Sequence, residues 1–138
     1  MNGFDLEIIS PEKKIFEGKV VAVSVPGTKG SFQVLSNHAP LISTFDIGVI
    51  RVDMLDNTKK VYSTSGGSIE VLNNKVLILS DTIEAVESID LERARKSKAR
   101  AEERLAKRSP DLDIERARAS LARALNRIKT VEKYSFTE

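Results

Sequence analysis

Hydrophobic and polar positions alternate over the first part of the chain with the period of two that half-buried strands show. Residues 4–9 place Phe4, Leu6 and Ile8 on one side, and Val21, Val23 and Val25 are likewise expected to share one face. Further β-rich runs separated by turn residues cover 31–35, 47–54, 61–64, 69–72 and 76–79. Short strands at this spacing predict an antiparallel β-sandwich.

Turn chemistry between these runs indicates where strands pair. Asp56-Asn57 and Asn73-Asn74 each separate two β-rich runs and are predicted to close hairpins. Gly66 and Gly67 interrupt another run, and we expect a backbone requirement there, either positive φ or close strand approach.

From residue 89 onward the pattern changes to one of helices. The segment 89–95 reads IDLERAR and the segment 112–118 reads LDIERAR, and Asp90 and Asp113 are each placed to cap a first turn. The echo continues, since Ser97 and Arg100 recur as Ser120 and Arg123. The sequence therefore predicts a duplicated helix folded into a hairpin, with a sandwich domain over 1–87 and a helical domain over 88–138.

The two helices carry matching basic rows and unequal apolar rows. At about 100° per residue, each row of three arginines falls on one line: Arg93, Arg100 and Arg104, then Arg116, Arg123 and Arg127. The second helix has the apolar row Ile114, Ala117, Leu121, Ala124, Ile128 and Val131, whereas the first has Leu91, Ala94, Lys98, Ala101 and Leu105. So little apolar area predicts a weakly closed hairpin.

Composition limits the protein class. The chain has 138 residues, 41% hydrophobic positions and no cysteine, so we expect one compact domain with an appendage and no thiol chemistry. No run approaches the roughly 20 apolar residues that span a bilayer, and the first residues do not resemble a signal peptide. The net charge of +2 hides a basic tail, because about two thirds of the Lys and Arg follow Ser88. On charge alone, two solvated helix faces are the favoured explanation of that tail.

The residues predict no catalytic centre. His38 is the single histidine and has no cysteine or local carboxylate partner, so neither a triad nor a metal cluster is nominated. Residues 27–30 read GTKG, which is not a phosphate-binding loop, and Glu102 and Glu103 are adjacent on a helix and point apart. We therefore predict that the chain by itself is not an enzyme.

Three segments carry a family resemblance. Residues 30–41 (GSFQVLSNHAPL), residues 65–71 (SGGSIEV) and the start of the tail at Ile89-Asp90 with Arg93-Ala94 resemble the epsilon subunit of the bacterial F-type ATP synthase. Their order and spacing cover nearly the whole chain. The resemblance implies a sandwich of about ten strands followed by a two-helix hairpin.

The resemblance also implies a role and partners. It implies a non-catalytic rotor subunit that sits against gamma and the c-ring, couples rotation to the catalytic head, and lies at the cytoplasmic face of the cell membrane. It further implies that the helices can extend toward the alpha and beta subunits and inhibit ATP hydrolysis. No required cofactor, no metal and no nucleic-acid partner is implied.

The resemblance also implies a possible regulatory ligand, because some family members bind ATP in the folded hairpin. The residues that match their ATP-binding positions are Glu84, Ile89, Asp90, Arg93, Ala94, Arg116, Arg123 and Arg127. Asp90 has a sufficient alternative role as a helix cap. The same motif recurs at Asp113, so part of the match to the ATP-binding motif is also explained as a helix-start motif that this sequence uses twice.

Departures from the family fall in the sandwich. Ser31 replaces a commonly acidic residue near the c-ring, Gln33 replaces Gly, and Ser36-Asn37 replaces Pro-Gly. Ser31 and His38 are the candidate subunit contacts, although the favoured explanation of His38 is a turn residue that hydrogen-bonds its own loop.

Two other classes of function are compatible with a sandwich and a basic tail. One is a nucleic-acid-binding module, although aromatic content is only 5% and glutamates interrupt the arginines. The other is a free-standing nucleotide-sensing adaptor.

Overall fold

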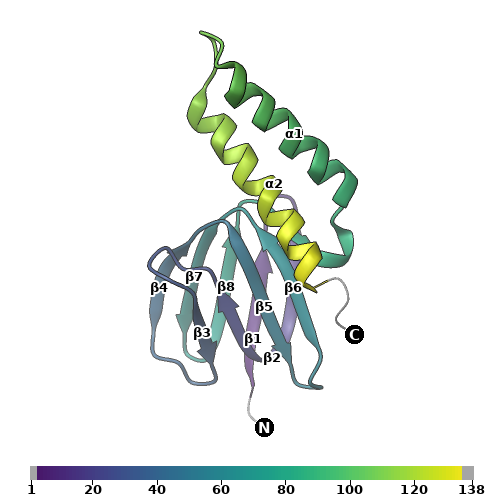
Figure 1. Ribbon diagram of the computed structural model, residues 1–138. Helices are drawn as coiled ribbons and strands as arrows, with labels where there is room; N and C mark the ends of the chain where they lie inside the picture. Colours follow the sequence, from purple (N-terminus) through teal and green to yellow (C-terminus); the bar gives the residue numbers. More distant parts are fainter. Residues whose placement is uncertain (1–2, 135–138) are drawn as a thin grey trace. The chain divides into compact units, whose positions relative to one another are not determined.

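A computed structural model describes residues 3–134, and the chain divides after Ala85 into two compact units (Figure 1). The first unit contains nine strands within the described residues: β1 (Phe4–Ile9), β2 (Lys14–Val25), β3 (Phe32–Leu35), β4 (Leu41–Phe45), β5 (Gly48–Met54), β6 (Lys59–Thr64), β7 (Gly67–Leu72), β8 (Lys75–Ser80) and β9 (Ile83–Ala85). The second contains a 3-10 turn, η1 (Val86–Ser88), and the helices α1 (Leu91–Lys107) and α2 (Ile114–Tyr134). The predicted fold class, a β-sandwich followed by a two-helix hairpin, is confirmed.

The long strand β2 joins the two layers of the sandwich. The strand order is β4-β7-β8-β1-β2-β5-β6-β9, with β3 paired to β2 beside this path. The first half of β2 pairs with β1, and its second half pairs with β5 on one edge and β3 on the other. A register shift between Val20 and Ala22 marks the change, which is how a bulge bends a strand from one layer into the next.

The bulge corrects one expectation about which side chains share a face. Val23 and Val25 are buried, but Val21 is only half-buried, while its neighbours Val20 and Ala22 are buried. An extra residue in one strand reverses the alternation beyond it, so Val21 does not join the other two valines. The expectation of antiparallel pairing also needs a correction, because β1 and β8 pair in parallel.

Alternate residues of all nine strands meet in one hydrophobic core. Its fully buried members include Phe4, Leu6, Ile8, Ile50, Ile69 and Ile78. These residues lie on the inner faces that the alternation predicts, and burying each large side chain contributes about 1.5–3 kcal/mol. The sandwich therefore has an independent core of its own.

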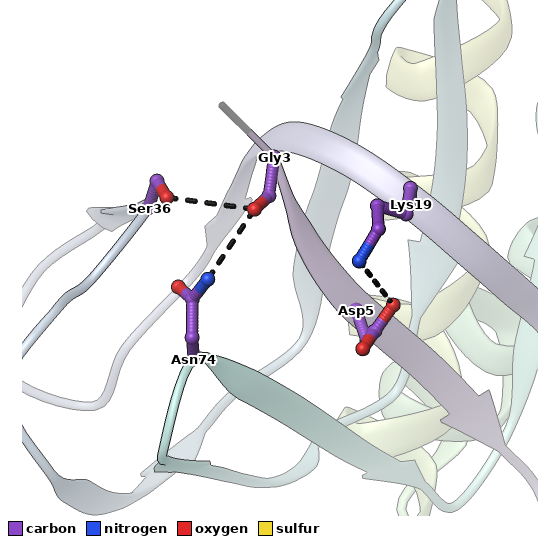
Figure 2. Close-up of polar contacts among 5 residues, drawn as sticks. All are labelled: Gly3, Asp5, Lys19, Ser36 and Asn74. Carbon is purple, nitrogen blue, oxygen red and sulfur yellow. Dashed lines mark hydrogen bonds and ion pairs between the residues drawn. The ribbon is translucent and has the colours of Figure 1, made fainter. Parts of the chain in front are cut away.

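The two predicted hairpins form around asparagines in the left-handed conformation. Asn57 (φ 69°) turns β5 into β6, and Asn73 and Asn74 (φ 52° and 60°) turn β7 into β8. At Asn73-Asn74, positive φ at both central residues gives the turn that matches the twist of paired strands. Asn74 also holds a neighbouring loop, since its amide Nδ2 donates to the Gly3 carbonyl oxygen at 3.3 Å (Figure 2).

The Gly66-Gly67 pair is a backbone requirement. Gly66 has φ 120°, and a Cβ on Gly67 would collide with the carbonyl oxygen of Leu79 and lie 2.9 Å from the Phe45 ring. A buried hydroxyl pair fixes this segment: Thr64 Oγ1 lies 2.7 Å from Ser80 Oγ and accepts from the Gly66 amide at 3.1 Å. The structure thus explains both glycines without a ligand.

In the second unit, α1 and α2 run antiparallel and pack side by side along their length (Figure 1). Arg108 ends α1 in the left-handed conformation, with its amide donating to the Arg104 carbonyl oxygen at 3.1 Å. The fully buried side chains of the two helices are small: Ala94 and Ala101 on α1, and Ala117, Ala124 and Thr130 on α2. The larger residues of the predicted apolar rows, such as Leu105, Leu121 and Ile128, are half-buried.

Candidate functional site

The two helix starts have the same cap. Asp90 Oδ1 accepts from the Arg93 amide at 3.0 Å, and Asp113 Oδ1 accepts from the Arg116 amide at 3.0 Å. Each bond satisfies one amide that a first turn leaves without a helical partner. Both aspartates therefore act as caps, and each keeps its second carboxylate oxygen for another contact.

The duplication extends from the sequence to side-chain geometry. Arg100 Nη2 donates to Ser97 Oγ at 3.2 Å, and Arg123 Nη2 donates to Ser120 Oγ at 3.3 Å, 23 positions further along. The buried alanines match in the same way, with Ala94 and Ala101 recurring as Ala117 and Ala124. Two helices of repeated sequence that pack antiparallel are related by an approximate twofold axis. Each end of the hairpin therefore presents one helix start and one helix end.

The antiparallel packing decides which predicted ATP residues meet. Arg104 near the end of α1 lines a cavity with Ala117 of α2. Because both helices rise by about 1.5 Å per residue, moving back to Arg93 on α1 corresponds to moving forward to the level of Arg127 on α2. Arg123 lies about one turn before Arg127. The structure thus brings Arg93, Arg123 and Arg127 toward the end of the hairpin where α1 starts, which we call the base end.

Arg116 lies at the opposite end of the hairpin. It is in the first turn of α2, and the 11 residues to Arg127 correspond to about 16 Å along the helix. The structure does not bring Arg116 together with Arg93. We call its end, where the helices connect, the turn end.

The remaining predicted residues have structural roles. Ala94 is 3% exposed and packs in the helix seam, and Ile89 is half-buried just before the Asp90 cap. Glu84 belongs to the first unit, where it lies on β9 and pairs with Ser63 of β6.

A cavity of about 460 Å³ opens at the turn end. Its lining residues come from the end of α1, the connection and the first two turns of α2: Arg104, Ser109, Asp111, Leu112, Asp113, Arg116, Ala117 and Ser120. Of these, the sequence nominated only Arg116. The signal that identifies Arg104 is the 23-residue offset, since Arg104 is the first-copy equivalent of Arg127.

The predicted subunit-contact residues lie on the loops that flank β3. Ser31 is exposed and follows Gly30, whose φ is 125°. His38 is half-buried, and its Nδ1 donates to the Ala39 carbonyl oxygen at 2.7 Å, since a carbonyl only accepts. This contact is the local loop bond expected of a turn residue.

The loop that carries His38 is anchored to the sandwich. The Asn37 amide donates to Asn74 Oδ1 at 2.6 Å, and Ser36 Oγ donates to the Gly3 carbonyl oxygen at 3.5 Å. Figure 2 shows Ser36 and Asn74 converging on Gly3, with the Lys19–Asp5 ion pair nearby. Ser36 and Asn37, which depart from the family pattern, therefore hold this loop against the sandwich through hydrogen bonds.

Within residues 3–134, no group of three or more His, Cys, Asp or Glu side chains is arranged to hold a metal ion. In the same range, no helix combines the length and apolar character needed to cross a bilayer.

Comparison with known proteins identifies the family. Residues 3–86 match the beta-sandwich domain of the ATP synthase delta/epsilon chain, and residues 87–132 match its long alpha-helix domain. The chain belongs to the delta/epsilon chain family of ATP synthase. The predicted resemblance is confirmed, and with it the prediction of a non-catalytic subunit of that complex.

The relatives carry one name. The chain is 51% identical over 124 residues to the ATP synthase epsilon chain of Pelotomaculum thermopropionicum, covering 90% of this chain and 92% of that one. It is 40% identical over 127 residues to the epsilon chain of Desulforamulus reducens, covering 92% and 96%. Neither a free-standing adaptor nor a nucleic-acid module is favoured by these matches.

Solved structures agree on the fold. The Euglena gracilis mitochondrial ATP synthase (OSCP/F1/c-ring) contains a chain that superposes with a TM-score of 0.75 at 22% identity, over 95% of this chain and 80% of that one. A chain of the Tetrahymena thermophila mitochondrial ATP synthase central stalk and c-ring superposes with a TM-score of 0.56 at 12% identity, over 94% and 93%.

Proposed function

We propose that this chain is the rotor subunit of an F-type proton-translocating ATP synthase, in which residues 1–87 bind the central stalk and residues 88–138 regulate ATP hydrolysis. The family membership supports the assignment to the complex, and the relatives support the epsilon position within it. The complex would place the chain at the cytoplasmic face of the cell membrane, peripheral to the bilayer.

The sandwich offers a docking face for gamma and the c-ring. Ile42 on β4, Leu72 on β7 and Leu79 on β8 are 78%, 51% and 45% exposed. Strand register places all three on the outer face of adjacent strands, because Ile42 pairs with Glu70 and Leu79 pairs with Ser68. Large apolar side chains gathered on an outer face mark an interaction surface. Ser31 and His38 on the nearby loops are the proposed polar contacts.

The observation that carries the regulatory role is the composition of the helix seam. The fully buried apolar residues of the hairpin are four alanines, whose side chains contribute about 0.8 kcal/mol each on burial. Closing such a hairpin leaves a small free-energy difference between folded and extended arrangements, which is what a two-state switch requires. When extended, the arginine rows would contact acidic surface of the alpha and beta subunits and inhibit hydrolysis.

ATP is the proposed ligand of the folded hairpin at the base end. Arg93, Arg123 and Arg127 supply guanidinium groups for phosphate, and the second oxygen of Asp90 accepts from a ribose hydroxyl. Ile89 and Ala94 shape the site by packing. Glu84 is included by resemblance. No further cofactor is required.

Ligand binding to one state shifts the balance toward it. A ligand at a hundredfold excess over its Kd stabilises the state that binds it by about 2.7 kcal/mol. This value is comparable with the seam contribution, so ATP would decide whether the hairpin is closed. High ATP would then hold the inhibitory helices down, and low ATP would release them.

The test is ATP hydrolysis by the assembled complex with this subunit intact or truncated after Ile89. Truncation should raise hydrolysis while gamma and the catalytic head still copurify with the sandwich. Equal hydrolysis by intact and truncated complexes would contradict the regulatory role. Failure of the sandwich to copurify with gamma would contradict the rotor assignment.

A further inference from the structure

We infer that the turn end of the hairpin is a second nucleotide-binding site, formed by Arg104 and Arg116 around the 460 Å³ cavity and related to the base end by the internal duplication. The choice of ligand class rests on the proposed function, because it assumes that the base end takes ATP. The site itself rests on the cavity and its side chains.

Because of the duplication, each residue at one end of the hairpin has an equivalent at the other end. An offset of 23 positions converts Arg93 into Arg116 and Arg104 into Arg127. The pair Arg93 and Arg127 at the base end therefore corresponds to the pair Arg116 and Arg104 at the turn end. The motif is repeated as well, since residues 112–117 (LDIERA) match residues 89–94 (IDLERA) at the first apolar, Asp, Arg and Ala positions.

The arginines at the turn end are free to bind an anion. Arg104 and Arg116 come from different helices and line the same cavity. Within the part of the chain that the structure describes, neither guanidinium has a carboxylate within 4.0 Å, unlike Arg118, which lies 4.0 Å from Glu115. Two unpaired guanidinium groups facing one cavity suit a polyphosphate, which offers several oxygens for paired hydrogen bonds.

The other lining residues favour a nucleotide over inorganic phosphate. Asp111 and Asp113 also line the cavity, and Asp113 uses one carboxylate oxygen as the α2 cap. Carboxylates repel a bare anion, but they accept hydrogen bonds from ribose hydroxyls and from the amino group of adenine. Leu112 and Ala117 add apolar contact. The cavity volume falls within the range of about 300–1,000 Å³ that small-molecule sites occupy.

A second site at the turn end would act in the same direction as the first. Its arginines come from both helices, so a nucleotide between them binds only the closed hairpin. Two sites that each favour the closed form make closure depend more steeply on nucleotide concentration than one site does.

The test is a titration of the full-length protein with ATP, followed by NMR of the arginine side-chain Nε–Hε groups. Signals of Arg93 and Arg127 report the base end, and those of Arg104 and Arg116 report the turn end. We expect both sets to move. In the double variant Arg104→Gln/Arg116→Gln, the turn end is followed by the backbone amide signals of Leu112 and Ser120, which line the cavity. Binding there should weaken by about tenfold or more while the base-end arginine signals still move.

The matched control is Arg95→Gln/Arg118→Gln, which removes the same charge from exposed positions that are also related by 23 residues and do not line the cavity. The control should leave both sets of shifts intact. Base-end shifts without turn-end shifts would overturn the second site and leave the proposed function standing. Turn-end shifts alone would support the second site and contradict the proposed ATP site at the base end.

Inorganic tripolyphosphate separates the ligand classes. A nucleotide site predicts that tripolyphosphate binds the turn end more weakly than ATP, because it offers nothing to Asp111, Asp113 and Leu112. Equal shifts of the Arg104 and Arg116 signals with both compounds would overturn the assignment to nucleotides.

Discussion

Replacing Ala101 with leucine should open the helix hairpin selectively. Ala101 is 2% exposed in the seam between α1 and α2. Leucine adds about three methylene-sized groups to a position without room for them, and overpacking of this kind costs about 1–3 kcal/mol. The extended form pays no such cost, because leucine and alanine are both strong helix formers.

The size of the effect can be compared with what closes the hairpin. Four buried alanine side chains contribute about 3 kcal/mol in total, with further contributions from half-buried residues such as Leu121 and Ile128. An overpacking cost of about 1–3 kcal/mol changes the ratio of closed to open hairpin by about 5- to 150-fold. The substitution thus removes much of the seam's contribution.

Amide hydrogen exchange measures this change. Most of the stability of a helix in a protein comes from the tertiary packing of its apolar face, so amides of an opened hairpin exchange faster. In Ala101→Leu the α1 amides should exchange about 5- to 150-fold faster than in the control Ala99→Leu, which makes the same change at an exposed position two residues away. Equal exchange in the two variants would refute the alanine-seam reasoning. Sandwich amides should be unaffected in both.

Three smaller predictions concern the sandwich. Gly67→Ala should lower the thermal midpoint by about 4–8 °C for each kcal/mol of overpacking, whereas Gly18→Ala, whose added Cβ meets ordinary contacts at 3.5 Å, should change it little; similar melting of both variants would contradict the close approach at Gly67. Thr64→Val should cost about 1–3 kcal/mol in denaturant unfolding because buried hydrogen-bonding groups lose their partner, and an unchanged midpoint would argue against the hydroxyl pair. Hydrogen bonds from Thr58 hold the pKa of Asp56 below its usual 3.8, so the turn's contribution is present above that pH and is lost as pH falls through the lower, folded pKa; NMR titration should show the pKa of Asp56 rising in Thr58→Val, and no rise would contradict this cause.

Local sequence signals predicted the parts of the fold that depend on neighbours in the chain. The hairpins at Asn57 and at Asn73-Asn74 follow from turn chemistry, and both helix starts follow from Asp90 and Asp113. These features need only a few adjacent residues, so periodicity and capping rules suffice to place them.

The pairing of strands that are distant in the sequence could not be predicted from such local signals. The parallel pairing of β1 with β8 joins segments about 70 positions apart, and no turn records it. The edge strand β4 was not predicted, because Ile42 is exposed where alternation would place a polar residue. The bulge at Val20–Ala22 reverses the faces of β2, and only pairing with β5 reveals it.

The candidate site was predicted in its parts but not in its arrangement. The arginine rows place Arg93, Arg116 and Arg127 correctly on their helices, yet a row on each helix does not indicate which ends meet. Antiparallel packing sets Arg127 level with Arg93 and places Arg116 with Arg104 instead. The 23-residue repeat is visible in the sequence. Which arginines it places at the same end of the hairpin depends on whether the helices pack parallel or antiparallel.

The central claim, that the hairpin takes two arrangements, can be tested with spin labels in the assembled complex. The chain has no cysteine, so Lys96→Cys and Lys129→Cys at exposed positions of the two helices give a unique pair when this chain is labelled before assembly. Packed helices lie about 8–10 Å apart, and the closed hairpin should hold the labels within about 20 Å. Fully extended helices would separate them by about 50 Å at 1.5 Å per residue. The account predicts the short distance at high ATP and a growing long-distance population as ATP is removed; a single short distance under every nucleotide condition would contradict it.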